Sequence, residues 1–189
     1  AEAELSAVRS SIDDGHLVDA RWRLKALEEW AGALPEVADL RQRVDAADQE
    51  ANELWVQLVQ LKEGRRFDDA KHVAGRLGER AGDLPGPSGE SLAQVAEQID
   101  AALTELGRRV EAALAVDALV RESSILELVD EFPDSTAVRA ALRSVPVAAP
   151  SRVMARMGAG AITISWKASP SRGDLTYRVF RTMHADDGS

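Results

Sequence analysis

The sequence has no cysteine, few aromatic residues and no long apolar run, and each shortage narrows the classes of protein that it can encode. Without cysteine there are no disulfides and no thiolate nucleophiles. No apolar run approaches the roughly 18 residues that a membrane-spanning helix requires. Aromatic residues make up 4% of the 189 residues and hydrophobic residues 45%. This composition suits closely packed helices better than a sandwich or barrel.

Motifs for catalysis, cofactors and metals are also missing. His16, His72 and His184 are scattered, and none has a metal-ligand spacing. Gly158-Ala159-Gly160 lacks the third glycine and the following helix of a dinucleotide-binding loop. Acidic pairs such as Asp68-Asp69 are typical of helix starts and solvated faces. We therefore expect no enzyme activity, no cofactor and no metal site in this chain.

Charge is distributed unevenly along the chain. Residues 1–150 carry 17 Lys and Arg against 29 Asp and Glu, whereas residues 151–189 carry 6 against 3, which together give the net charge of −9. Phosphate neutralisation needs a clustered basic face. An acidic body therefore argues against a nucleic-acid-binding scaffold.

The N-terminus carries little information about the compartment. Ala1-Glu2-Ala3-Glu4 is acidic and amphipathic, so it is not a signal peptide, and the cytoplasm is favoured. The chain does not start with Met, and we interpret it as a fragment of a larger protein. The compartment of that parent protein stays open.

An Asp-Ala pair recurs three times, each time followed fifteen positions after the Ala by a Pro. The copies are Asp19-Ala20 with Pro35, Asp69-Ala70 with Pro85, and Asp117-Ala118 with Pro133. Self-similarity at a period of roughly 50 residues is typical of stacked helical units that bury their apolar faces against one another. We therefore expect an antiparallel helical-repeat array of about seven helices over residues 1–145.

Apolar periodicity predicts the individual helices. They are expected at residues 2–14, 17–33, 36–63 and 66–82, from about residue 90 to a break, from that break to the residues before Pro133, and at about 133–144. The break after the fifth helix has two candidate places. Gly107 is favoured, because glycine inside a helix costs about 1 kcal/mol relative to Ala. The repeat register instead places the break near Ala113 to Ala115.

The segment after residue 145 has a different pattern. Residues 146–150 are a Pro-rich linker, and from residue 151 the apolar period changes to two. Alternation around Val153, around Ile162 to Trp166, and around Tyr177 predicts three short antiparallel strands. A sheet this small is marginal alone. We therefore expect intramolecular packing or a dimer to cover Trp166.

Two family resemblances accompany these patterns. Gly15-His16-Leu17-Val18-Asp19-Ala20 and Arg65-Arg66-Phe67-Asp68-Asp69-Ala70 resemble the second half of a tetratricopeptide repeat, although the period is near 50 rather than 34. This resemblance implies antiparallel helical hairpins. Pro150, Val153, Ala155, then Gly160 to Trp166, and Tyr177-Arg178-Val179 resemble the start of a fibronectin type III domain. That resemblance implies a truncated β-sandwich over residues 151–189.

The most interesting side chains are Trp22, Trp30 and Trp55. Tryptophan is enriched at binding hot spots, and repeat arrays bind partners along their surfaces, but tryptophan near a helix stripe also packs in cores. These three residues are our candidate protein-partner contacts. We expect a non-enzymatic interaction or spacer fragment of a multidomain bacterial protein. The alternative is an envelope or secreted protein in which fibronectin type III domains space a carbohydrate-active module.

Overall fold

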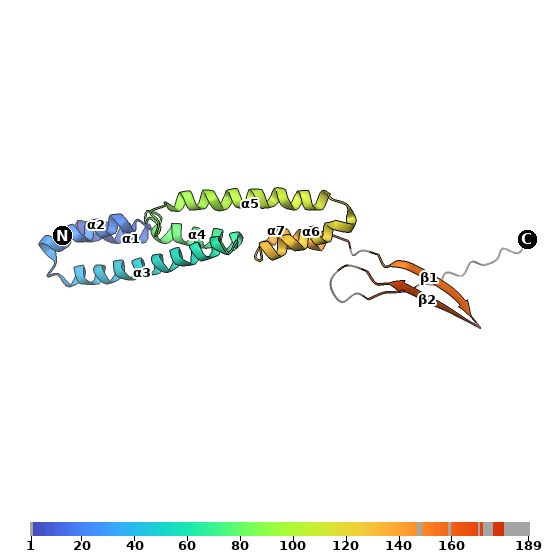
Figure 1. The fold of residues 1–189 in the computed structure, drawn as a ribbon. Coiled ribbons are helices and arrows are strands. Elements are labelled where there is room, and N and C mark those ends of the chain that lie inside the picture. The colour runs from blue at the N-terminus through green and yellow to red at the C-terminus, as the bar shows by residue number, and fades with distance from the viewer. Residues whose placement is uncertain (1, 147–148, 159, 170, 172–175, 180–189) are drawn as a thin grey trace, which may run out of the picture. The chain divides into compact units, whose positions relative to one another are not determined.

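The described part of the chain contains seven helices and one two-stranded antiparallel sheet (Figure 1). The structure is a computed structural model, and it describes residues 2–146, 149–158, 160–169, 171 and 176–179. The chain divides into two compact units, Ala1–Ser144 and Val145–Ser189. The predicted fold class, mainly helical with a short antiparallel β segment, is confirmed.

The helical unit is a series of hairpins in which consecutive helices pack against each other. The helices are α1 (Glu2–Asp13), α2 (Leu17–Ala31), α3 (Pro35–Glu63), α4 (Phe67–Ala81), α5 (Leu92–Ala115), α6 (Ala118–Glu131) and α7 (Thr136–Ser144). Pro35 begins α3, where its missing N–H leaves no hydrogen bond unmade. The long helix α3 packs against both α2 and α4.

Glycine is required at the turn between α1 and α2. Gly15 has a φ of +73°, and a Cβ there would lie 2.7 Å from the carbonyl oxygen of Glu79. Its own carbonyl accepts a hydrogen bond from the backbone N–H of Gly82, at 3.0 Å. The backbone of the first hairpin thus touches the end of α4. In the second hairpin the turn residue Arg65 has a φ of 53°, and its side chain pairs with Glu131.

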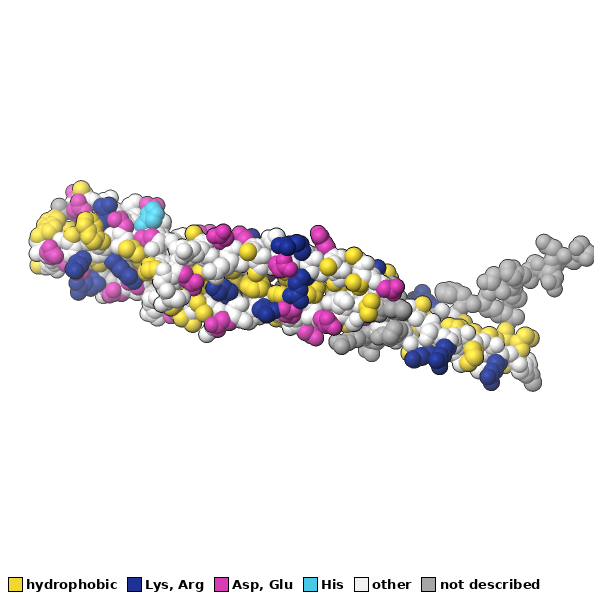
Figure 2. Space-filling view, turned by 45° about the horizontal axis from the view of Figure 1, so that its top comes forward, with side chains coloured by type: hydrophobic (Ala, Val, Ile, Leu, Met, Phe, Trp, Pro, Cys, Tyr) yellow, Lys and Arg dark blue, Asp and Glu magenta, His cyan; other side chains and the backbone are white. Residues whose placement is uncertain are grey.

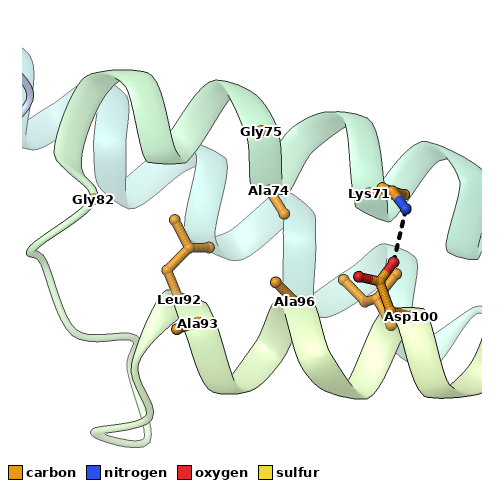
Figure 3. A pocket seen from close by; sticks show the side chains of 9 residues that line it. Lys71, Ala74, Gly75, Gly82, Leu92, Ala93, Ala96 and Asp100 are labelled. Atoms are coloured by element: carbon orange, nitrogen blue, oxygen red, sulfur yellow. Dashed lines mark hydrogen bonds and ion pairs between the residues drawn. The ribbon is translucent and has the colours of Figure 1, made fainter.

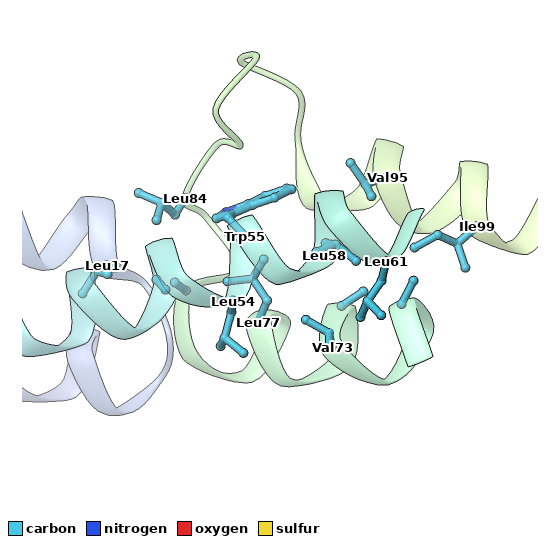
Figure 4. Close-up of a cluster of buried hydrophobic side chains, with 14 residues drawn as sticks. Leu17, Leu54, Trp55, Leu58, Leu61, Val73, Leu77, Leu84, Val95 and Ile99 are labelled. Atoms are coloured by element: carbon cyan, nitrogen blue, oxygen red, sulfur yellow. The ribbon is translucent and has the colours of Figure 1, made fainter. Parts of the chain in front are cut away.

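Two apolar clusters form the core of the helical unit. The first joins α1, α2 and the start of α3, and includes Val8, Leu27 and Leu40. The second joins α3, α4 and α5 around Trp55 and Leu77 (Figure 4). Leu17 at the start of α2 belongs to the second cluster. The apolar faces of successive hairpins are therefore buried against one another, as expected of a repeat array.

The N-termini of α2 and α4 are capped by aspartates from distant loops. His16 and Arg66, which precede these helices, make no side-chain cap. Instead, Asp83 accepts hydrogen bonds from the backbone N–H groups of Leu17 and Val18, at 2.8 and 2.9 Å. Asp134 likewise accepts one from the N–H of Asp69, at 2.9 Å.

The two aspartate caps follow the repeat. Asp83 is 66 residues after Leu17, and Asp134 is 65 residues after Asp69. At the second cap, a residue of α4 also caps the later helix α7. Asp68 accepts hydrogen bonds from the N–H and the hydroxyl of Thr136, which begins α7. A carboxylate at a helix N-terminus satisfies donors that have no partner within the helix. Each cap therefore joins one hairpin to the next.

The favoured helix break at Gly107 is wrong, and the alternative near Ala113 to Ala115 is correct. α5 runs through Gly107 to Ala115, and Val116 then adopts an extended conformation. Leu106, Val110 and Ala113 stay buried along one face of α5 across the glycine. Burial of this continuous stripe outweighs the glycine penalty of about 1 kcal/mol.

The second unit contains a hairpin of β1 (Ser151–Gly158) and β2 (Ala161–Lys167). Met157 pairs with Ile162, and Ala155 with Ile164, so apolar side chains share one face of the sheet. Of the predicted third strand, residue 175 lies outside the described residues, and 176–179 form no strand, so three strands is not what the described chain shows.

The apolar face of the hairpin is largely exposed within the second unit. Trp166 contacts the ring of Tyr177, with 5.5 Å between the ring centroids. It nevertheless keeps 38% of its surface exposed in the single chain. Apolar contact with a single ring leaves most of a two-stranded sheet open to water. Cover by packing within the chain or by a second copy stays a prediction.

Candidate functional site

The three tryptophans predicted as partner contacts have different environments. Trp22 and Trp30 are 70% and 61% exposed on α2, whereas Trp55 on α3 is 1% exposed. The ring of Trp55 lies so close to Gly86 that a Cβ there would be 3.0 Å from it. Trp55 therefore packs in the core and is not available to a partner, while Trp22 and Trp30 are.

The exposure of Trp22 and Trp30 follows from the two faces of α2. Leu17, Ala20, Leu24, Leu27 and Ala31 recur in steps of three and four and are buried against the body. On the opposite side, apolar residues recur in steps of four as Val18, Trp22, Ala26 and Trp30, and all are exposed. We call these four residues the α2 tryptophan face. In Figure 2 hydrophobic side chains gather at the end of the body where α1 and α2 lie.

The corresponding face of α4 is polar. Fifty residues after the members of the α2 tryptophan face, the repeat places Asp68, His72, Arg76 and Arg80 on α4. These positions have the same place in their helical hairpin but carry charged or polar groups, as a solvated helix face does. The apolar character is therefore a property of α2 and does not come from the repeat pattern.

Charged residues around the α2 tryptophan face are mostly held in ion pairs. Arg21 pairs with Asp48, Arg23 with Asp19 at 2.7 Å, and Glu28 with Arg41. Lys25 and Glu29, both exposed, have no ion pair with the described residues. One cation and one anion, four residues apart, are thus free beside the exposed indoles.

Hydrogen bonds in these pairs shift the pKa of their members. The hydroxyl of Ser11 and then the guanidinium of Arg23 lower the pKa of Asp19 below its ordinary value. Its Oδ2 accepts from Ser11 at 2.6 Å and from Arg23 Nε at 2.7 Å. The hydrogen bond to Glu28 raises the pKa of Arg41. These shifts favour the charged forms and are typical of surface ion pairs.

A groove of about 420 Å³ lies between α4 and α5 (Figure 3). Small apolar residues line it, including Ala74 and Gly75 from α4 and Ala96 from α5, and Lys71 and Asp100 form an ion pair beside them at 2.7 Å. Both charged side chains are well exposed and already neutralise each other. The groove offers no unpaired charge to orient a ligand.

The described residues form no candidate metal centre. Within the described ranges no three His, Cys, Asp or Glu side chains are placed to hold a metal ion. His16 precedes α2 and His72 lies in α4, while His184 is outside the described residues. None of the helices in the described ranges has the length and apolar character needed to cross a membrane.

Sequence reasoning named Trp22 and Trp30 but missed two other parts of this site. The first is Val18, which continues the spacing of Trp22, Ala26 and Trp30 in steps of four and was visible in the sequence. The free charges Lys25 and Glu29 could have been found only with the positions of their neighbours. Comparison with protein families, curated proteins and solved structures finds no significant match.

Proposed function

We propose that this chain is a non-enzymatic protein-interaction scaffold within a larger multidomain bacterial protein, and that the α2 tryptophan face is its binding surface. Two indoles of a soluble helix keep 70% and 61% of their surface exposed. Tryptophan is among the residues that contribute most to protein interfaces when it is buried there. The helical body holds this face in place through the buried side of α2.

The observation that carries the proposal is the difference between α2 and α4. If exposure of large apolar residues were incidental to the repeat, the positions of Trp22 and Trp30 would be apolar in α4 as well. They are His72 and Arg80. A helix that carries exposed tryptophans where its structural counterpart is polar has the composition of an interface and not of a solvated face.

A matched pair of variants tests the proposal. The immobilised chain would be used to capture proteins from an extract of the cells that produce it. Trp22→Gln with Trp30→Gln removes the exposed indoles, whereas His72→Gln with Arg80→Gln alters the same two positions of α4. We expect at least one captured protein to fall roughly tenfold or more with the first variant and to remain with the second. Identical captured sets would overturn the proposal.

We also propose that the second unit corresponds to the first strands of a fibronectin type III domain. The antiparallel pairing of β1 with β2, the shared face of Ile162 and Ile164, and the Trp166–Tyr177 contact support this. Nuclear magnetic resonance contacts between Met157 and Ile162 would check the register. A register shifted by one residue would turn the apolar face over and contradict the assignment.

A further inference from the structure

We propose that the α2 tryptophan face binds the same face of a second copy of this chain, in a two-fold symmetric, antiparallel crossing of two α2 helices centred on Ala26. The inference rests on the proposed function and names the partner of its binding surface. Three features of α2 lead to it: the symmetry of its exposed stripe, its ridge geometry and the order of its charges.

The exposed stripe reads nearly the same in both directions. From Ala26 outward, a tryptophan lies four residues away on either side. Val18 lies four residues before Trp22 on α2, and Leu34, four residues after Trp30 in the sequence, lies past the end of α2 in the turn before α3. Their exposures are also matched, with 70% and 61% for the indoles and 43% and 38% for Val18 and Leu34. In a two-fold interface one patch must complement itself. A stripe symmetric about its centre meets that condition when two copies run antiparallel.

The spacing of the stripe suits direct packing of helix on helix. Residues at steps of four form a ridge, and two such ridges interdigitate at a crossing angle of about −50°, the commonest packing of helices in globular proteins. The small residue Ala26 lies at the crossing point, where the backbones approach most closely. Trp22 and Trp30 lie about 6 Å along the axis from it on either side. Trp22 of each copy then lies against Trp30 of the other copy.

The charges of α2 complement each other only in the antiparallel arrangement. The helix carries three basic and three acidic residues, so it is neutral within a chain of net charge −9. Asp19, Arg21, Arg23 and Glu28 are held in ion pairs within the chain. Of the two charges left on α2, the basic Lys25 precedes Ala26 and the acidic Glu29 follows it. An antiparallel crossing places Lys25 of each copy near Glu29 of the other. A parallel crossing would place like charges together.

The area available indicates a weak dimer. An indole buries about 150–250 Å² when fully enclosed. The four partly exposed indoles of two copies would together bury roughly 400–600 Å² of apolar surface. This area would form the apolar centre of an interface of about 1,200 Å² in total, which is near the lower limit for specific protein–protein interfaces. We therefore expect a dissociation constant on the order of micromolar.

Sedimentation equilibrium of the full chain, from about 1 to several hundred micromolar, measures the association. We expect a monomer–dimer equilibrium that Trp22→Gln or Trp30→Gln weakens at least tenfold. Ala26→Arg places a long charged side chain at the crossing point and should abolish the dimer. His72→Gln, at the position of Trp22 on α4, should leave it unchanged. Circular dichroism checks that each variant keeps its helices.

Charge reversal tests the antiparallel order. Lys25→Glu alone and Glu29→Lys alone should each weaken the homodimer roughly tenfold, because each brings two like-charged pairs together. A mixture of the two variants should form a heterodimer at the wild-type level, since every pair is then of opposite sign. The double variant Lys25→Glu with Glu29→Lys should also recover the wild-type dimer. Failure of both combinations to recover would refute the antiparallel crossing.

The outcomes separate this inference from the proposed function. A chain that stays monomeric throughout, or a dimer indifferent to Trp22, Trp30 and Ala26, overturns the inference, and the second result would move the contact to another surface such as the exposed hairpin. If capture of another protein still depends on the indoles, the proposed function survives. If neither association nor capture depends on them, both fail.

Discussion

Asp19 in α2 connects this helix to α1 and also takes part in an ion pair on the surface. Its carboxylate accepts hydrogen bonds from the buried hydroxyl of Ser11 in α1 and from Arg23 one turn further along α2. These two donors lower the pKa of Asp19 below its ordinary value in the folded chain. Because the unfolded chain lacks them, the unfolded state binds the proton more readily.

Asp19→Asn is therefore expected to make the acid side of the stability profile less steep. The stabilisation by the charged carboxylate is fully present above the unfolded pKa and is lost as the pH falls through the lower folded pKa. Urea unfolding of both chains between about pH 5 and pH 2.5 checks this. The wild-type chain should lose stability more steeply than the variant over that range.

Asp39→Asn is the control for the acid profile. Asp39 is also exposed on the helical body and has no ion pair with the described residues. Its replacement should leave the profile with the slope of the wild-type chain. Equal profiles for Asp19→Asn and Asp39→Asn would show that the hydrogen bonds at Asp19 do not survive in solution.

The three tryptophans show how far the environment of a single residue could be predicted from the sequence. Residue type alone placed Trp22, Trp30 and Trp55 in one group, because each lies near a helical apolar stripe. Trp55 is enclosed by α3 and by the loop that carries Gly86. That loop is 31 positions away in the chain, so its position over the ring depends on tertiary packing that no local pattern encodes.

At the scale of secondary structure, α5 is the element that overrides a local signal. Gly107 lies in the middle of the helix, and a Cβ there would meet no other atom within 4 Å. No neighbouring segment therefore needs a glycine at this position in order to pack closely against α5. The glycine therefore only adds backbone freedom to the unfolded chain and weakens the helix.

Gly107→Ala should accordingly stabilise the protein by about 0.5–1 kcal/mol. Gly15→Ala is the contrasting variant, because that glycine has a positive φ and a Cβ would lie 2.7 Å from the carbonyl oxygen of Glu79. It should destabilise by well over 1 kcal/mol, and both values come from urea unfolding. Loss of stability in Gly107→Ala would mean that the chain turns at that position.

The end of α5 shows which kind of sequence signal was informative. No helix-breaking residue occurs between Ala113 and Ala115, so local rules placed the break at Gly107. The recurrence of the Asp-Ala pair placed the break correctly. The backbone carbonyl of Asp117 accepts hydrogen bonds from the N–H groups of Val120 and Arg121 and so begins the next helix. Long-range repetition reports the packing register of a whole hairpin, which local propensity does not.

At the scale of the helical body, stability is expected to be held locally, hairpin by hairpin. Asp83 fastens the start of α2 to the loop after α4, and Asp134 fastens the start of α4 to the loop after α6. In a repeat array each unit contacts only its neighbours, so a change at one junction propagates weakly. The two aspartates thus make a matched pair of probes at two different junctions.

Asp134→Ala should loosen α6, α7 and the first turn of α4, and should leave α1 and the first half of α3 unchanged. Asp83→Ala should loosen the first turn of α2 and the end of α4, and should leave α7 unchanged. Each variant removes a cap and is expected to cost about 0.5–2 kcal/mol locally. Amide hydrogen exchange, read by mass spectrometry at peptide resolution, locates the faster exchange in each variant.

The spatial pattern of exchange decides between a chain of units and a single cooperative body. If the two variants speed exchange at opposite ends, the hairpins open as separate units joined by their caps. If either variant speeds exchange evenly from α1 to α7, the local account is wrong. Leu17, which reaches from α2 into the second cluster, and the long helices then couple the two clusters into one unit. Asp39→Asn, which removes a surface carboxylate but no cap, should leave exchange unchanged throughout the body.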